Sequence, residues 1–170
     1  MNDQSSSQAA NANPIAEQQS NEESWSELRC IDPGDPRILG FLQICADRRF
    51  FKCIQDQFQA DAGLDSRNSY WIHADAGGTP KMECQRTAPD YCYYDKGVRK
   101  MGWSAHGNGC GGFGPNVPDP VIQQALNVVS RRKVEDYPDA DHYVYFATLL
   151  KKGDAEEAVV YCRKCEKRAD

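Results

Sequence analysis

The sequence has no hydrophobic run near the roughly 20 residues that a membrane-spanning helix needs. Its first residues also lack the basic start and the apolar stretch that are typical of a signal peptide. These absences argue against a membrane protein and against export. We therefore expect a soluble, cytoplasmic protein that has no membrane partner.

Basic residues are missing from the first part of the chain. Residues 1–27 contain no Lys or Arg, whereas their acidic residues are Asp3, Glu17, Glu22, Glu23 and Glu27. This segment carries the whole net charge of −5, and the remaining 20 acidic residues balance the 20 basic ones. Because Lys and Arg are scattered along this neutral part, it has no positive stripe for a phosphate backbone. We expect no nucleic-acid partner.

Large apolar side chains are almost absent from residues 1–24, so this stretch cannot bury enough surface to offset the entropy of ordering it. We predict a disordered acidic tail over residues 1–27, and a helix over residues 14–21, ordered by a partner subunit, is the alternative. The remaining residues, 28–170, suffice for one well-buried core and are too few for two. We predict a single domain there.

Eight cysteines are present, and they allow two interpretations. A disulfide framework belongs to short secreted chains, and this chain shows no export signal. We therefore expect reduced thiols. Thiols near a His and an Asp are better interpreted as metal ligands or nucleophiles, because the thiolate is the form that binds zinc.

Short apolar runs that stop at polar or glycine residues are typical of buried parallel strands. Such runs lie at residues 38–44, 69–74 and 98–105. Two further strands are predicted at residues 143–150 and 158–161, joined by a turn at residues 151–154.

Helices are predicted between these strands. Apolar residues recur at helical spacing over residues 50–58, and the segment 80–97 has a weaker helical pattern. Asp119 and Pro120 stand where an N-cap and a first helical residue belong, before an apolar helical face. The order predicts an α/β fold with a mostly parallel central sheet flanked by helices and closed by a C-terminal hairpin.

Polar residues of the kinds that bind metals follow two of the predicted strands. Cys45, Asp47 and Arg49 come after the first strand, and His106 and Cys110 come after the third. Because loops at the carboxyl ends of parallel strands gather at one edge of a sheet, we expect these residues to lie together.

Two Cys and one His are a ligand set that suits Zn²⁺, and a catalytic zinc keeps one position open for water. Zinc lowers the pKa of that water from 15.7 to about 7, which makes a nucleophile at neutral pH. We predict that Cys45, His106 and Cys110 bind the metal. Asp47 would orient the nucleophile, and Arg49 would hold Asp47 ionised and in place through a forked contact.

These motifs resemble those of the β-class carbonic anhydrases. The resemblance lies in Cys45-x-Asp47-x-Arg49, in the glycine turn at residues 76–78 after the second strand, and in a later His and Cys followed by two glycines, and it spans about residues 37–161. It implies a carbonic-anhydrase-like fold, zinc held by Cys, His and Cys, and an Asp–Arg dyad. It also implies a homodimer or higher homo-oligomer and the reversible hydration of carbon dioxide to bicarbonate.

Two positions differ from the family's usual pattern. The spacing His106-x-x-x-Cys110 is one residue longer than the family's His-x-x-Cys, and we expect the glycine-rich loop to bulge there. Ala74-Asp75 stands where the family tends to have Arg-Asn. Two alternatives stay open: hydrolysis of carbonyl sulfide or carbon disulfide at the same site, or a binding or scaffold protein that retains the fold.

Structural interpretations of the same residues also stay open. Asp47 and Arg49 could form a salt bridge at the sheet edge. His73 or His142 could replace His106 as a ligand, although their positions in predicted strands favour core or surface roles.

Cys162-x-x-Cys165 near the carboxyl end is a further candidate pair. Its spacing suits a second metal site or a redox dithiol, but no other cysteines show a matching spacing. The alternative is two separate thiols on a charged terminal segment.

Overall fold

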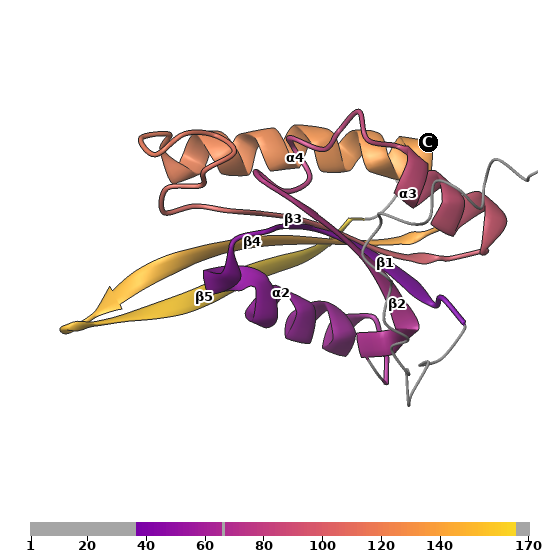
Figure 1. Ribbon diagram of the computed structural model, residues 1–170, viewed down its shortest axis with the longest axis horizontal. Helices are drawn as coiled ribbons and strands as arrows, with labels where there is room; N and C mark the ends of the chain where they lie inside the picture. Colours follow the sequence, from indigo (N-terminus) through magenta and orange to yellow (C-terminus); the bar gives the residue numbers. More distant parts are fainter. Residues whose placement is uncertain (1–36, 66, 166–170) are drawn as a thin grey trace, which may run out of the picture. The chain divides into compact units, whose positions relative to one another are not determined.

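The computed structural model describes residues 37–65 and 67–165. These residues form a five-stranded sheet in the order β2-β1-β3-β4-β5 (Figure 1). The strands are β1 (Gly40–Cys45), β2 (Tyr70–Asp75), β3 (Lys100–His106), β4 (Asp141–Lys152) and β5 (Ala155–Cys165). The first four strands run parallel, and β5 pairs antiparallel with β4. The α/β class with a mostly parallel sheet is thus confirmed, whereas the predicted tail lies outside the described residues.

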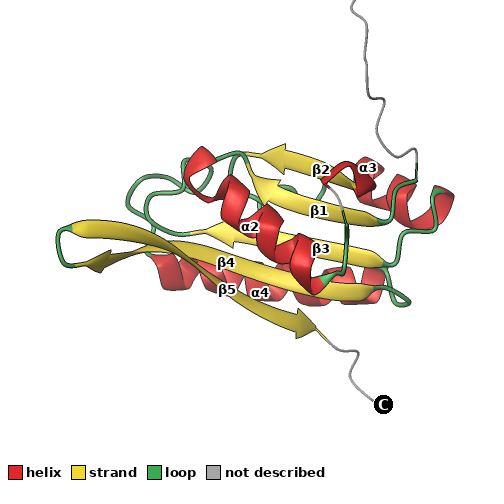
Figure 2. Ribbon diagram, turned by 90° about the horizontal axis from the view of Figure 1, so that it is seen from below, coloured by secondary structure: helices red, strands yellow, loops and turns green. Residues whose placement is uncertain are grey.

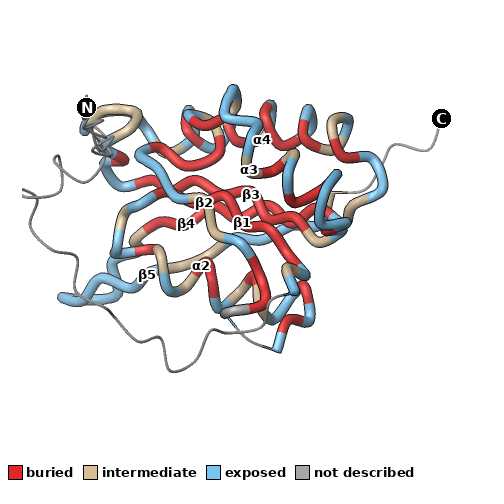
Figure 3. The backbone as a smooth tube through the Cα atoms, turned by 45° about the vertical axis from the view of Figure 1, so that its right-hand side comes forward, coloured by how far each residue is buried: buried red, intermediate tan, exposed pale blue. Residues whose placement is uncertain are grey.

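Helices cover both faces of the sheet. Figure 1 shows α4 (Asp119–Asp136) and the short α3 (Thr87–Asp90) on one face and α2 (Arg48–Asp61) on the other. Every residue of β1 is buried, as expected for a parallel strand covered on both sides (Figure 3). Phe41 packs in the core on the α4 side, and its neighbour Leu42 packs in the core on the α2 side.

The fit of α2 on the sheet depends on a glycine. Phe58 of α2 is fully buried, and it lies over Gly102 of β3. A Cβ at Gly102 would come within 2.9 Å of the Phe58 ring and 2.7 Å of Leu42. The glycine therefore lets α2 pack closely on the sheet. Figure 2 shows the helix lying across the strands.

Two helix predictions need correction. The helix expected over residues 80–97 is mostly absent. The structure has only the short α3 and a π-helical turn at Tyr91–Asp95 in this segment. The segment before them forms turns, which begin at the Gly77 and Gly78 positions of positive φ. The helix α4 begins at Asp119 itself, with Pro118 as N-cap. Asp119 does not act as the predicted N-cap, because its carboxylate binds other segments.

The closing hairpin is confirmed, but it is longer than the sequence indicates. β5 continues past the predicted end at residue 161 and pairs with β4 as far as Cys165. The β4–β5 hairpin reaches beyond the other strands in Figure 2. Within the part of the chain that the structure describes, no helix combines the length and apolarity that crossing a membrane requires.

Candidate metal centre

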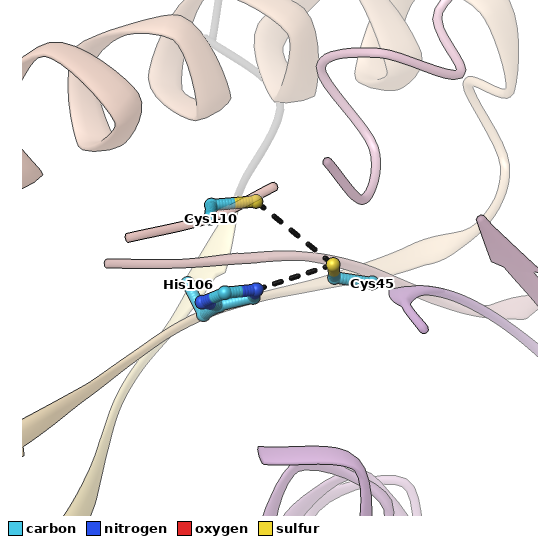
Figure 4. A group of neighbouring side chains, drawn as sticks. All are labelled: Cys45, His106 and Cys110. Carbon is cyan, nitrogen blue, oxygen red and sulfur yellow. Dashed lines mark hydrogen bonds between the residues drawn. The ribbon is translucent and has the colours of Figure 1, made fainter. Parts of the chain in front are cut away.

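Three buried side chains meet at the carboxyl edge of the sheet. Cys45 is the last residue of β1, His106 is the last residue of β3, and Cys110 lies in the loop that follows. Cys45 is 5% exposed, and the other two are fully buried. Their ligand atoms all lie within 4.8 Å of one another (Figure 4). The predicted cluster is therefore present, and it could hold a metal ion.

The distances suit a tetrahedral metal ion. The Cys45 and Cys110 Sγ atoms are 3.9 Å apart, and His106 Nε2 is 3.2 Å from Cys45 Sγ. Tetrahedral zinc with its usual bond lengths needs sulfurs about 3.8 Å apart and a sulfur and a nitrogen about 3.6 Å apart. These two distances are close to those that such an ion needs, and His106 and Cys110, whose ligand atoms lie within 4.8 Å of each other, would have to come to about 3.6 Å.

The imidazole of His106 is oriented for metal binding. Its Nδ1–H donates to the carbonyl of Gly107 over 2.6 Å, which leaves the Nε2 lone pair facing Cys45. The Phe50 ring of α2 stacks on the imidazole, with centroids 4.6 Å apart and planes 26° apart. Ring orientation and tautomer are thus set by the fold, and this role of Phe50 carries no signal in the sequence beyond its apolar character.

The two thiols are unequal. Hydrogen bonding from the Cys110 thiol lowers the pKa of Cys45 well below its usual range, although burial opposes this shift. His106 and the Gly77 N–H, which lies 3.3 Å from the sulfur, add to the lowering. The neighbouring Cys45 and burial raise the pKa of Cys110. A bound cation would draw the proton from Cys110 as well, because coordinated thiols are deprotonated.

The glycine turn after β2 contributes backbone and not a side chain. Gly77 donates its N–H to Cys45 and has a φ of 92°. Gly112 lies against it, and a Cβ on Gly112 would come 2.4 Å from the Gly77 nitrogen. The two glycine-rich loops therefore touch beside the cluster, and larger residues would separate them.

Asp47 and Arg49 lie next to the cluster. Asp47 is the N-cap of α2, and its Oδ1 accepts the Arg49 N–H at 3.0 Å. The Arg49 guanidinium donates to both carboxylate oxygens, at 2.7 Å from Nη2 and 3.1 Å from Nε, and this lowers the pKa of Asp47. The Asp47 Oδ2 atom is 3.6 Å from His106 Nε2. The pair is a salt bridge that faces the ligands, so the structural and the catalytic interpretations both remain compatible with it.

The loop between the second and third ligands bulges, as the glycines led us to expect. Asn108 has a φ of 51° and Gly109 a φ of 76°. Two successive left-handed residues turn the chain between His106 and Cys110. Both ligands therefore still reach Cys45.

The other histidines lie elsewhere. His142 is near the start of β4, at the opposite end of the strands, where it accepts the Trp103 Nε1–H at 2.9 Å and bonds to the Tyr137 carbonyl. His73 of β2 faces Gln43, and its Nδ1 atom lies 3.4 Å from the Nε2 atom of Gln43. Neither belongs to the three-residue group that could hold a metal.

Cys162 and Cys165 lie on opposite faces of β5. Cys162 pairs with Tyr145, which belongs to the core on the α2 side. Cys165 packs against the core on the α4 side. Residues three apart on a strand point in opposite directions, so the two thiols cannot share an ion or close a disulfide without breaking the strand.

No family model, curated protein or solved structure matches the chain. The support for a function is therefore the residue pattern and the geometry of this centre.

Proposed function

We propose that the chain is a zinc enzyme that reversibly hydrates carbon dioxide to bicarbonate. One arrangement carries the proposal: Cys45, His106 and Cys110 share a space that suits one ion, and an Asp–Arg pair lies beside them. The order of these residues resembles that of the β-class carbonic anhydrases, and the α/β sheet is compatible with their fold.

Zinc is the metal that this donor set favours. Two thiolates and one imidazole suit a borderline-soft cation, whereas magnesium and calcium prefer oxygen ligands. Three protein ligands leave a fourth tetrahedral position for solvent or substrate. When bound, zinc acts as a Lewis acid and lets water lose a proton near neutral pH.

Asp47 is placed to orient a reacting water. Its Oδ2 atom lies 3.6 Å from the imidazole nitrogen that would bind the metal, so a water held beside that nitrogen would be within reach of this oxygen. Arg49 lowers the pKa of Asp47 and keeps it an acceptor, while the N-cap contact fixes its rotamer. A carboxylate held this way accepts a hydrogen bond from water and directs the oxygen lone pair toward a substrate carbon.

Limited access favours a small substrate. The three ligands are at most 5% exposed, and the Asp47 side chain is 22% exposed. Carbon dioxide suits such a site, and carbonyl sulfide and carbon disulfide are linear molecules of the same kind. We propose carbon dioxide as the substrate and a homodimer or larger homo-oligomer as the assembly, both on the resemblance.

The test combines metal analysis with assays of stopped-flow carbon dioxide hydration and of carbonyl sulfide hydrolysis on the full chain. The wild type should contain about one zinc per chain and turn over carbon dioxide, and Cys45→Ser should lose both. Cys84→Ser is the matched control, because Cys84 is exposed and outside the cluster. It should keep both properties.

Three results would contradict parts of the proposal. Zinc retained by Cys45→Ser would reject the ligand assignment. Zinc with turnover only of carbonyl sulfide would reject the substrate. Zinc without turnover of either substrate would favour a binding or scaffold protein.

A further inference from the structure

The bulged loop between His106 and Cys110 is anchored to two distant segments. The Asn108 N–H donates to Asp119 Oδ1, at the start of α4, over 2.8 Å. The Asn108 side-chain oxygen accepts the Leu149 N–H of β4 over 2.9 Å and also contacts the Thr148 hydroxyl. The loop is therefore attached to α4 and β4 through one residue.

The two partners of Asn108 in this anchor, Asp119 and Thr148, also bond to each other. Thr148 Oγ1 lies 2.7 Å from Asp119 Oδ2, and Thr148 is 7% exposed. Gly107 packs against the same carboxylate, because a Cβ there would come 2.1 Å from Asp119. Asn108 is exposed, Asp119 is half-buried and Thr148 is buried, and the hydrogen bonds among the three residues restrain the loop.

Asn108 also contacts the Asp–Arg pair. Its backbone carbonyl accepts a hydrogen bond from Arg49 Nη2 over 3.1 Å, and the same Nη2 donates to Asp47 over 2.7 Å. The Arg49 side chain is 46% exposed. Without a fixed second acceptor, its guanidinium would bond to water and leave this position more often. Arg49 thus bridges the anchored loop and Asp47.

We propose that Asn108 is a positioning residue that aligns Arg49, and through it Asp47, with the Cys45–His106–Cys110 centre. This inference rests on the proposed function, because it assigns Asp47 a role at that centre. Its basis is the geometry of the anchored loop. Asn is the non-glycine residue best suited to the position, because it tolerates a positive φ and its side chain makes the anchor.

The test uses Asn108→Gly, which keeps the left-handed backbone and the carbonyl but removes the side-chain anchor. Asn116→Gly is the matched control, since Asn116 is exposed on the same connecting segment. A second variant, Thr148→Val, removes the hydroxyl that contacts both Asn108 and Asp119 and keeps a β-branched residue in the strand.

The direct measurement is the rate at which the Arg49 Nε–H exchanges with solvent, followed by its ¹H–¹⁵N signal. This N–H donates to both oxygens of Asp47. In Asn108→Gly its solvent exchange should be about tenfold faster, the factor expected from the loss of about one hydrogen bond. Thr148→Val should change it in the same direction. The Arg86 Nε–H, which lies in another ion pair, should not change.

Activity gives the second measurement. Asn108→Gly should keep about one zinc per chain, keep its KM and lower kcat about tenfold to a hundredfold, as misplacement of a catalytic group does. Asn116→Gly should match the wild type in all measurements.

The outcomes separate this inference from the proposed function. An unchanged Arg49 signal in Asn108→Gly, or an equal change in Asn116→Gly, would overturn the positioning role. Loss of zinc from both Asn108→Gly and Thr148→Val would also overturn it, because the anchor would then build the ligand loop. A wild type without turnover would reject the function, and the Arg49 signal would still decide the role of Asn108.

Discussion

Gly112 lies so close to Gly77 that a Cβ on Gly112 would come within 2.4 Å of the Gly77 nitrogen. That nitrogen donates its hydrogen to Cys45 Sγ over 3.3 Å. The contact joins the loop after β2 to the loop after β3, and it explains why position 112 is a glycine. The glycine turn supports a thiolate through its backbone.

A substitution at this contact should weaken metal binding. Gly112→Ala pushes the two loops apart and withdraws the Gly77 N–H from Cys45, so we expect about a tenfold to hundredfold loss of zinc affinity, as for other groups that support ligands. Competition with a chromophoric chelator measures the change. Gly111→Ala is the matched control, because a Cβ there meets nothing within 4 Å. Equal affinities for the two variants would contradict the proposed role of the contact.

Asp47→Asn should separate catalysis from folding. Asn is as good an N-cap as Asp, so α2 should keep its start, and the three ligands are untouched. We expect zinc to remain and kcat for carbon dioxide hydration to fall about a hundredfold or more, because the oriented acceptor is lost. Stopped-flow assays and metal analysis measure the two effects. Full activity in the variant would mean that Asp47 only caps the helix and pairs with Arg49.

His142 should make the stability of the fold depend on pH. Burial lowers the pKa of His142 below its usual 6.5, although its bond to the Tyr137 carbonyl opposes this shift. The unfolded chain therefore binds a proton at a higher pH than the folded chain does. The contribution of His142 to the free energy of unfolding should be fully present above pH 6.5 and decrease as the pH falls from 6.5 toward the lower folded pKa.

Urea unfolding between pH 5 and 7.5 measures this dependence. His142→Leu should be less stable by about 1–3 kcal/mol, because the buried Trp103 Nε1–H loses its acceptor. The variant should also lack the part of the pH dependence that His142 supplies. Parallel pH profiles of wild type and variant would show that His142 does not supply it.

The meeting of Cys45, His106 and Cys110 could be predicted because each stands at the end of an apolar strand or in the loop after it, and parallel strands bring their carboxyl ends to one edge. Cys45 and His106 are the last residues of β1 and β3, as the apolar runs indicated. Asp47 and Arg49 follow from the same argument. The thiol and imidazole chemistry then restricts the choice of metal.

The anchor around Asn108 could not be predicted, because its members are far apart in the sequence and follow no period. Asp119 matched the pattern of a helix N-cap, yet its carboxylate binds Asn108 and Thr148. The Asp119 carboxylate thus bonds to residues distant in the sequence and does not make the local capping bond that the pattern predicted.

The length of β5 was also missed. Residues after 161 include Arg163 and Lys164, which are typical of an exposed terminal segment. They are nevertheless in register with Val144 and Tyr143 of β4. An exposed edge strand carries charged residues without losing its pairing, so composition alone did not mark its end.

The central claim is that Cys45, His106 and Cys110 bind one zinc ion together. Zinc-edge X-ray absorption of the purified chain tests it most directly. We predict two sulfur neighbours at about 2.3 Å with nitrogen or oxygen neighbours at about 2.0–2.1 Å, and one sulfur fewer in any zinc-loaded Cys110→Ser. Four sulfur neighbours, no sulfur, or an unchanged spectrum in Cys110→Ser would contradict the account.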